Sequence, residues 1–318
     1  MIQRSPRERR FAAFSPQGAK KHSVRPGVFL GRLLLACWLF LVPAAWAVDE
    51  GYALPAPVRG EYAAILGNKT SGTMVFEYEG RKVIAIIDFP TLAEQGRMFN
   101  RVVALIERIG APRGRVMSNE ELAQFIRSVG KTEATLAYGN DFLVAELVVF
   151  YNLADLGGIR LNAEELALRQ TLLDRRLMVM RNGFYQALIP QAVILSVPQV
   201  SAGGGGPAVS ELARRTILSH EISHAEYYTN PLYANFCRHF WRSVMTEGQR
   251  AAFRKFLSAS SYDPNNEEMM INETQAYLMY TPDPRAFSPR LVGLGEKDIS
   301  ALRKRFREGF PDAPPAAY

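Results

Sequence analysis

The sequence predicts an α+β domain that is mostly helical and carries a small sheet. Two β-rich runs, Thr73–Tyr78 and Lys82–Asp88, flank the turn residues 79–81, which is a hairpin pattern. Signals that start helices then recur through the middle of the chain, and two later stretches have helical spacing. We therefore expect strands near the beginning of the domain and helices over most of the remainder.

Helix starts are predicted at three residues whose side chains can accept a backbone N–H, namely Thr91, Ser118 and Asn162. Ser118 and Asn162 are each followed three residues later by a glutamate, the pattern of a capping box. We expect the first helix to reach about Ile109 and the third to reach Met178.

Two apolar stretches complete the predicted elements. Phe142–Ala154 is too short to cross a bilayer and is expected to form a buried helix. Ala187–Val197 is short, contains Pro190 and suits a strand near the edge of the sheet. A glycine-rich loop, Ser201–Pro207, then leads into the next helix.

The first 47 residues have the features of an export signal. They hold eight basic side chains and one acidic one, then an apolar run from Leu33 to Trp46 and the small-x-small site Ala45-Trp46-Ala47. We expect cleavage after Ala47, an uncleaved membrane anchor being the alternative. The protein is thus expected to be periplasmic or secreted, with no other membrane span.

The rest of the chain is electrically balanced. The formal net charge of +7 comes from the leader, so no basic patch with interleaved aromatic residues remains to suggest nucleic-acid binding. Residues 48–60 are rich in Pro and Ala and are expected to form a linker, and residues 61–318 are expected to form one folded domain. Cys237, the only cysteine after the leader, is expected to be a buried thiol.

The segment 214–226 contains the pattern His-Glu-x-x-His at helical spacing. Residues i and i+4 project from one helical face, so His220 and His224 can present two nitrogens to one zinc ion. Glu221 then lies beside the open coordination position and is the candidate catalytic base. The chain has four histidines in all, so this placement of two of them is informative.

A catalytic zinc site needs a third protein ligand, and a second helix offers one. Residues 265–280 are predicted to form a helix with Glu273, Tyr277 and Tyr280 at i, i+4 and i+7. We take Glu273 as the third ligand. The alternatives are Glu267, Glu268 and His239.

With Asn272-Glu273-Thr274-Gln275-Ala276 downstream of the His-Glu-x-x-His segment, the sequence resembles the gluzincins, zinc peptidases in which a glutamate of a later helix completes the metal site. It is also similar to uncharacterised putative metallopeptidases of bacteria. The resemblance covers residues 220–280 and implies a zincin-like fold with a small sheet beside the active-site helix. It also implies that an extended peptide substrate binds by strand addition at the strand expected over Ala187–Val197.

In the expected reaction Zn²⁺ is the only cofactor, and Glu221 accepts a proton from the water that attacks a peptide carbonyl. A phenol could stabilise the oxyanion, and four tyrosines lie on or near the two motif helices: Tyr227, Tyr228, Tyr277 and Tyr280. Glu226 or Asn272 could orient an imidazole, a solvated Glu226 being the favoured alternative for that residue.

The predicted function is an exported zinc metallopeptidase acting on peptides or proteins. One alternative is a zinc-binding protein of the cell envelope without catalytic activity, although a structural zinc site has no need of a base such as Glu221. Another is an exported interaction protein in which the His-Glu-x-x-His pattern is accidental.

Overall fold

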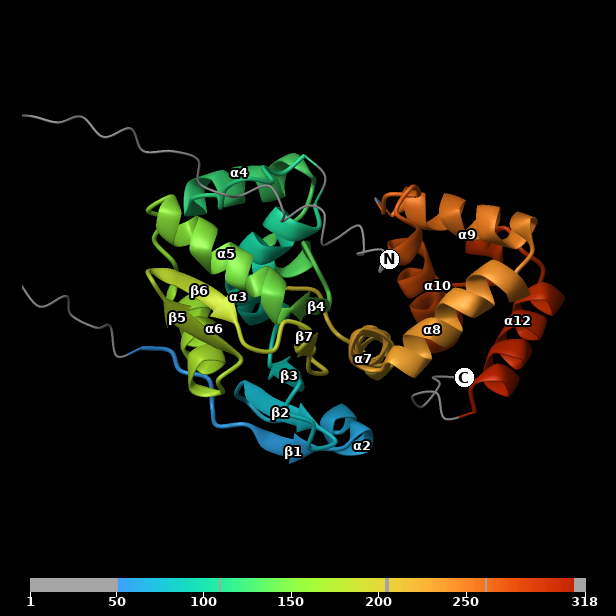
Figure 1. Cartoon of the computed structure of the whole chain (residues 1–318), viewed down its shortest axis with the longest axis horizontal. Coiled ribbons are helices and arrows are strands. Elements are labelled where there is room, and N and C mark those ends of the chain that lie inside the picture. Colours follow the sequence, from blue (N-terminus) through green and yellow to red (C-terminus); the bar gives the residue numbers. More distant parts are fainter. Residues whose placement is uncertain (1–50, 109, 204–205, 261, 312–318) are drawn as a thin grey trace, which may run out of the picture. The chain divides into compact units, whose positions relative to one another are not determined.

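A computed structural model of the chain describes residues 51–108, 110–203, 206–260 and 262–311. The predicted leader, residues 1–47, lies outside the described residues, as does Ile109. The domain is α+β with a small mixed sheet, as the sequence predicts. Its strands all end at or before Pro198, and the elements assigned to the described residues after them are helices (Figure 1).

The five-stranded sheet has the order β1-β2-β3-β7-β4. Its strands are β1 (Val58–Gly60), β2 (Met74–Tyr78), β3 (Ile84–Phe89), β7 (Val193–Pro198) and β4 (Asn140–Leu143). β2 and β3 form the predicted antiparallel hairpin, while β3 and β7 are parallel and β7 and β4 are antiparallel. A separate hairpin joins β5 (Met178–Arg181) to β6 (Phe184–Ala187).

Several helices precede the one that holds the His-Glu-x-x-His segment, and two of them have the predicted capping boxes. They are α2 (Tyr62–Leu66), α3 (Leu92–Ile106), α4 (Asn119–Ser128), α5 (Val144–Leu156) and α6 (Ala163–Asp174), with a 3₁₀ turn η1 (Glu133–Thr135). Thr91 caps α3, and the capping boxes of Ser118 with Glu121 and of Asn162 with Glu165 are formed.

Three sequence-based boundaries are wrong. Val58–Gly60 pairs with β2, so the expected linker over 48–60 ends earlier. The helix expected to reach Met178 ends at Asp174, because Arg176 adopts a positive φ of 54° that a helix cannot continue. Phe142 belongs to β4, and the buried helix starts after it.

The strand expected over Ala187–Val197 lies inside the sheet and not near its edge. It begins at Val193, three residues beyond Pro190, so Pro190 removes no hydrogen bond from it. It pairs with β3 on one side and β4 on the other, which leaves β4 as an outer strand.

The sheet is buried on both faces by alternating side chains. In β3, Ala85, Ile87 and Phe89 lie on one face of the sheet and pack with α3 and α5. Ile84 and Ile86 lie on the other face and pack against α7 (Glu211–Thr229). α7 therefore forms one wall of the sheet core.

The helices after α7 form a second hydrophobic cluster. They are α8 (Pro231–His239), the π-helical turn η2 (Phe240–Val244), α9 (Glu247–Ala259), α10 (Glu267–Tyr280), α11 (Pro289–Val292) and α12 (Glu296–Gly309). Cys237 is buried in this cluster, as predicted, and burial raises the pKa of its thiol. α7 lies between the sheet and these helices (Figure 1).

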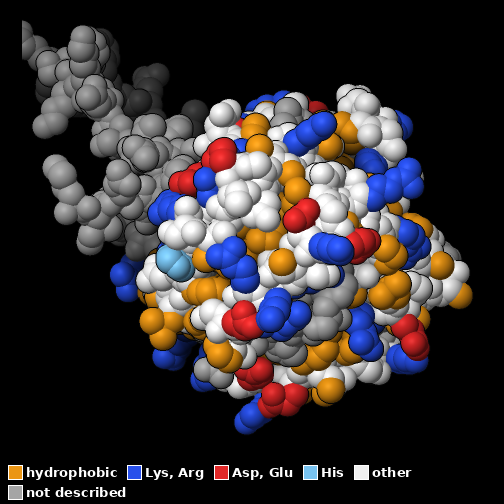
Figure 2. All heavy atoms as spheres, turned by 90° about the vertical axis from the view of Figure 1, so that its right-hand side faces the viewer, with side chains coloured by type: hydrophobic (Ala, Val, Ile, Leu, Met, Phe, Trp, Pro, Cys, Tyr) orange, Lys and Arg blue, Asp and Glu red, His pale blue; other side chains and the backbone are white. Residues whose placement is uncertain are grey.

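On the face over α8, α9 and α12, Figure 2 shows Lys and Arg side chains dispersed among acidic and hydrophobic ones. Within the described ranges, no helix has the length and apolarity that crossing a bilayer requires.

Candidate metal centre

α7 holds the His-Glu-x-x-His segment in the position that its apolar residues dictate. Ser210 caps its N-terminus, and Leu218, Ile222 and Ala225 pack against the sheet. Because these residues fix one face of the helix to the sheet, the faces carrying His220 and His224 turn toward α10.

α10 brings Glu273 to the two histidines. Asn266 caps this helix, and α10 packs along α7. The Nε2 atoms of His220 and His224 lie 3.7 and 3.8 Å from Glu273 Oε2. The structure thus assembles the three residues taken as metal ligands from the sequence.

Hydrogen bonds at the far ring nitrogens orient both imidazoles. The Oδ1 of Asn272 lies 3.0 Å from His224 Nδ1, and the Oγ1 of Thr281 lies 2.9 Å from His220 Nδ1. Thr281 donates its own proton to the Ala276 carbonyl, so its oxygen accepts from the imidazole. Both rings then carry the proton on Nδ1 and turn the Nε2 lone pair toward Glu273.

The chemistry of the three groups fits a zinc ion. Two neutral imidazoles and one carboxylate form the donor set of a catalytic site that keeps one position for water. A tetrahedral site with bonds of about 2.1 Å separates its ligand atoms by about 3.4 Å, slightly less than the distances to Glu273. Burial, followed by the neighbouring His224, lowers the pKa of His220 well below its usual value and favours the neutral, metal-binding form.

The carboxylate of Glu221 is buried beside this group. Only 7% of the residue is exposed, and burial followed by the charges of Asp141 and Glu273 raises its pKa well above the usual value. One carboxylate oxygen of Glu221 and one of Asp141 lie within 4.8 Å of each other and of an imidazole nitrogen of His224. Asp141 is on β4, and the sequence analysis did not single it out.

The backbone of Gly139, just before β4, lies close to this carboxylate. A Cβ atom at Gly139 would lie 2.3 Å from Glu221 Oε1 and 2.7 Å from Ile217 Cγ2. Only glycine therefore fits here without moving Glu221 or the strand.

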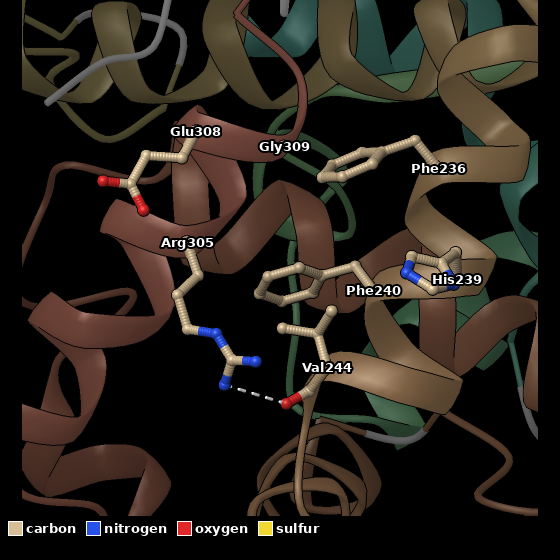
Figure 3. Close-up of a pocket in the computed structure, with 7 residues that line it drawn as sticks. All are labelled: Phe236, His239, Phe240, Val244, Arg305, Glu308 and Gly309. Atoms are coloured by element: carbon tan, nitrogen blue, oxygen red, sulfur yellow. Dashed lines mark hydrogen bonds between the residues drawn. The ribbon is translucent and has the colours of Figure 1, made fainter.

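The alternative third ligands lie elsewhere. Glu267 forms an ion pair with Arg242, and Glu268 accepts hydrogen bonds from Arg238 and Tyr227. His239 lines a separate pocket beside Phe240 and Arg305 (Figure 3). None of the three belongs to the groups of described residues with metal-ligand spacing.

Two of the four tyrosines considered for the oxyanion are bonded away from the site. Tyr227 donates to Glu268, and Tyr280 accepts from Tyr233. Tyr228 accepts from Asn272 at 3.2 Å, and the ring of Tyr277 lies edge-on to His220 with centroids 4.9 Å apart.

Tyr262, in the loop before α10, was not predicted as part of the site. Burial followed by the charge of Glu273 raises the pKa of both Tyr262 and Tyr277, so both phenols stay protonated and able to donate. Tyr262 donates its proton to Tyr277, whose ring lies against His220, so Tyr277 is the candidate oxyanion donor.

Glu226 differs from the expectation of a solvated side chain. It is buried and paired with Arg81 from the turn between β2 and β3, and not with an imidazole. Asn272, the other residue considered for this role, is the one that contacts His224.

Comparison of the chain with protein-family models, with curated protein sequences and with solved structures gives no match.

Proposed function

We propose that this protein is an exported zinc-dependent metallopeptidase with a zincin-like fold. The observation that carries the proposal is the meeting of His220, His224 and Glu273 from two helices, with the carboxylate of Glu221 beside them. A buried group of this composition is the donor set of catalytic zinc, and the adjacent glutamate is what a structural site lacks. Export rests on the sequence of residues 1–47.

A zinc ion held by the three residues would supply an activated water and polarise the scissile carbonyl. Glu221 then takes a proton from the attacking water and transfers it to the nitrogen of the leaving amine. Tyr277, whose ring lies against His220, would donate to the oxyanion. Asn272 and Thr281 hold the imidazoles in the tautomer that binds metal.

The substrate is a peptide bound along the outer strand of the sheet. The resemblance to gluzincins implies strand addition next to the active-site helix, and in this fold β4 is the outer strand that packs on α7. β4 takes the place of the strand expected over Ala187–Val197 as the proposed binding edge, because neighbouring strands already occupy both edges of that strand.

The test measures metal content by elemental analysis and hydrolysis of a peptide library by mass spectrometry. Wild type should carry about one zinc per chain. His224→Ala and Glu273→Ala should lose it, whereas Glu221→Gln should retain it and lose hydrolysis by at least about a hundredfold.

His239→Ala and Glu267→Gln are matched controls, because both change a candidate ligand type outside the site; they should keep metal and activity. A wild-type protein without bound zinc, or a Glu221→Gln variant with full activity, would refute the proposal.

A further inference from the structure

Asn272 turns its amide oxygen, and not its amide nitrogen, toward the ring of His224. The Oδ1 of Asn272 lies 3.0 Å from His224 Nδ1, and its Nδ2 donates to the hydroxyl of Tyr228. A hydroxyl can donate or accept, so Tyr228 does not by itself dictate which end of the amide faces the ring. The choice matters, because only the oxygen keeps the proton of His224 on Nδ1 and the lone pair on Nε2.

Ser223 begins a chain of hydrogen bonds whose direction is fixed at a backbone carbonyl. Its Oγ lies 2.7 Å from the carbonyl oxygen of His220, one turn earlier on α7. Because a carbonyl has no proton to give, Ser223 is the donor in this bond. A hydroxyl has a single proton, so Ser223 accepts from its other neighbour, the side chain of Gln275 at 3.2 Å.

Gln275 carries this direction from α7 to Asn272. Its Nε2 donates to Ser223 Oγ and to Asn272 Oδ1, both at 3.2 Å, which uses both protons of the amide nitrogen. The oxygen of the same amide accepts a hydrogen bond of 2.7 Å from Tyr233 of α8. The atom of Asn272 that faces Gln275 is therefore an acceptor, and the same oxygen accepts from His224.

Burial makes this direction costly to reverse. Ser223, Asn272 and Gln275 are all buried, so bulk water does not compete for their hydrogen bonds. If the Asn272 amide were reversed, its nitrogen would face the nitrogen of Gln275, and a buried donor would lose its acceptor. Ser223 and Gln275 both occupy unspecified positions of the patterns His-Glu-x-x-His and Asn-Glu-x-x-Ala.

We propose that Gln275 is a positioning residue of the metal centre, which sets the tautomer of His224 through Asn272. This inference rests on the proposed zinc site. Two acceptors compete for the proton of the neutral ring, Asn272 Oδ1 at 3.0 Å from Nδ1 and Glu273 Oε2 at 3.8 Å from Nε2. Without Gln275 the Asn272 amide can reverse, and the proton then moves to Nε2, where it blocks a metal ion.

The experiment records long-range proton–nitrogen correlation spectra of the zinc-free full chain with isotope-labelled histidine, at about pH 8, where an imidazole is neutral. The signals of His224 are those missing from the spectrum of His224→Ala. In wild type this ring should carry its proton on Nδ1. In Gln275→Met at least about half of the His224 rings should carry it on Nε2, and zinc affinity should fall at least about tenfold in competition with a chromogenic chelator.

A second substitution separates positioning from packing. A carboxylate accepts with either oxygen, so Asn272→Asp combined with Gln275→Met should return the proton of His224 to Nδ1 and restore most of the zinc affinity. A packing defect at residue 275 would persist in this double variant. Gln95→Met makes the same change at a buried glutamine of α3, and this matched control should behave as wild type.

A wild-type His224 ring with its proton on Nε2 overturns the inference, and this measurement needs no variant that folds. An unchanged tautomer and zinc affinity in Gln275→Met also overturns it, as does a double variant that recovers neither. The peptidase proposal is tested separately. If the tautomer responds as expected but the wild-type protein hydrolyses no peptide, the role of Gln275 stands and the peptidase proposal fails.

Discussion

α7 holds two buried ionisable side chains in opposite circumstances. Near its start, Arg214 is fully buried and donates to Asp88, which is also fully buried, and to the carbonyls of Leu66 and Pro198. Two turns later, Glu221 is buried without a cationic partner among the described residues, beside Asp141. Both groups are on one helix, and both are removed from water.

The difference separates an ionisable group whose partners the fold supplies from one that the proposed metal site leaves for a ligand. Asp88 also accepts from Asn68 at 2.7 Å, so the charges of the Asp88 and Arg214 pair are satisfied within the protein. A buried pair of this kind fixes how the sheet, α2 and α7 fit together. The charge at Glu221 is left for a ligand to satisfy, which is the expected condition of a site that binds a metal and a substrate.

The largest effect should follow from breaking the structural pair. Arg214→Met leaves the Asp88 carboxylate buried without its partner, and we expect the free energy of unfolding to fall by about 3 to 5 kcal/mol. Urea unfolding at neutral pH measures this. Lys69→Met, which removes a lysine from an exposed pair with Glu211, should cost less than about 1 kcal/mol. If the two variants were equally stable, the buried pair would contribute no more to stability than the exposed one, contrary to this prediction.

At the functional end of the helix, the expected loss is in catalysis. Gly139→Ala introduces a Cβ that would lie 2.3 Å from Glu221 Oε1, so the base must move. We expect kcat/KM on the best library peptide to fall about a hundredfold while zinc stays bound. Gly72→Ala, whose Cβ would meet no atom within 4 Å, should have wild-type activity. Full activity of Gly139→Ala would show that β4 yields to the added methyl group.

A smaller effect should follow from the groups that hold the imidazoles. Thr281→Val removes the acceptor for His220 Nδ1, and zinc affinity should fall about ten- to a hundredfold. Competition with a chromogenic zinc chelator measures the change. The matched control is Thr274→Val within α10, the helix that Thr281 caps, because the Thr274 hydroxyl is buried and has no hydrogen-bond partner among the described residues. Loss of affinity in both variants alike would point to α10 itself and not to the hydrogen bond.

Features that depend on a few neighbouring residues were predictable from the sequence. The capping boxes at Ser118 and Asn162 and the hairpin at residues 79–81 satisfy backbone groups locally, so their patterns carry the information. The spacing of His220 and His224 is also a local pattern, because both residues lie on adjacent turns of one helix. Glu273 required one further assumption, namely that two helices lie side by side.

Features that depend on distant parts of the chain were not predictable. The central place of β7 arises from parallel pairing with β3, more than a hundred residues earlier, and no pattern within residues 187–197 encodes that partner. Glu226 was expected in solvent because Arg81, from the distant hairpin turn, gives no sign of reaching it. Gly139, Asp141 and Thr281 join the site for the same reason, and their local sequence lacks any metal or catalytic motif.

The outer edge of β4 also bears on self-association of the protein. An exposed strand edge can pair with the same edge of another copy, which is a common beginning of aggregation. β4 is only four residues long, and two copies paired edge to edge would bring two Asp141 carboxylates close together. The charge of Asp141 thus protects the strand from copies of itself, so a neutral variant would gain a tendency to aggregate.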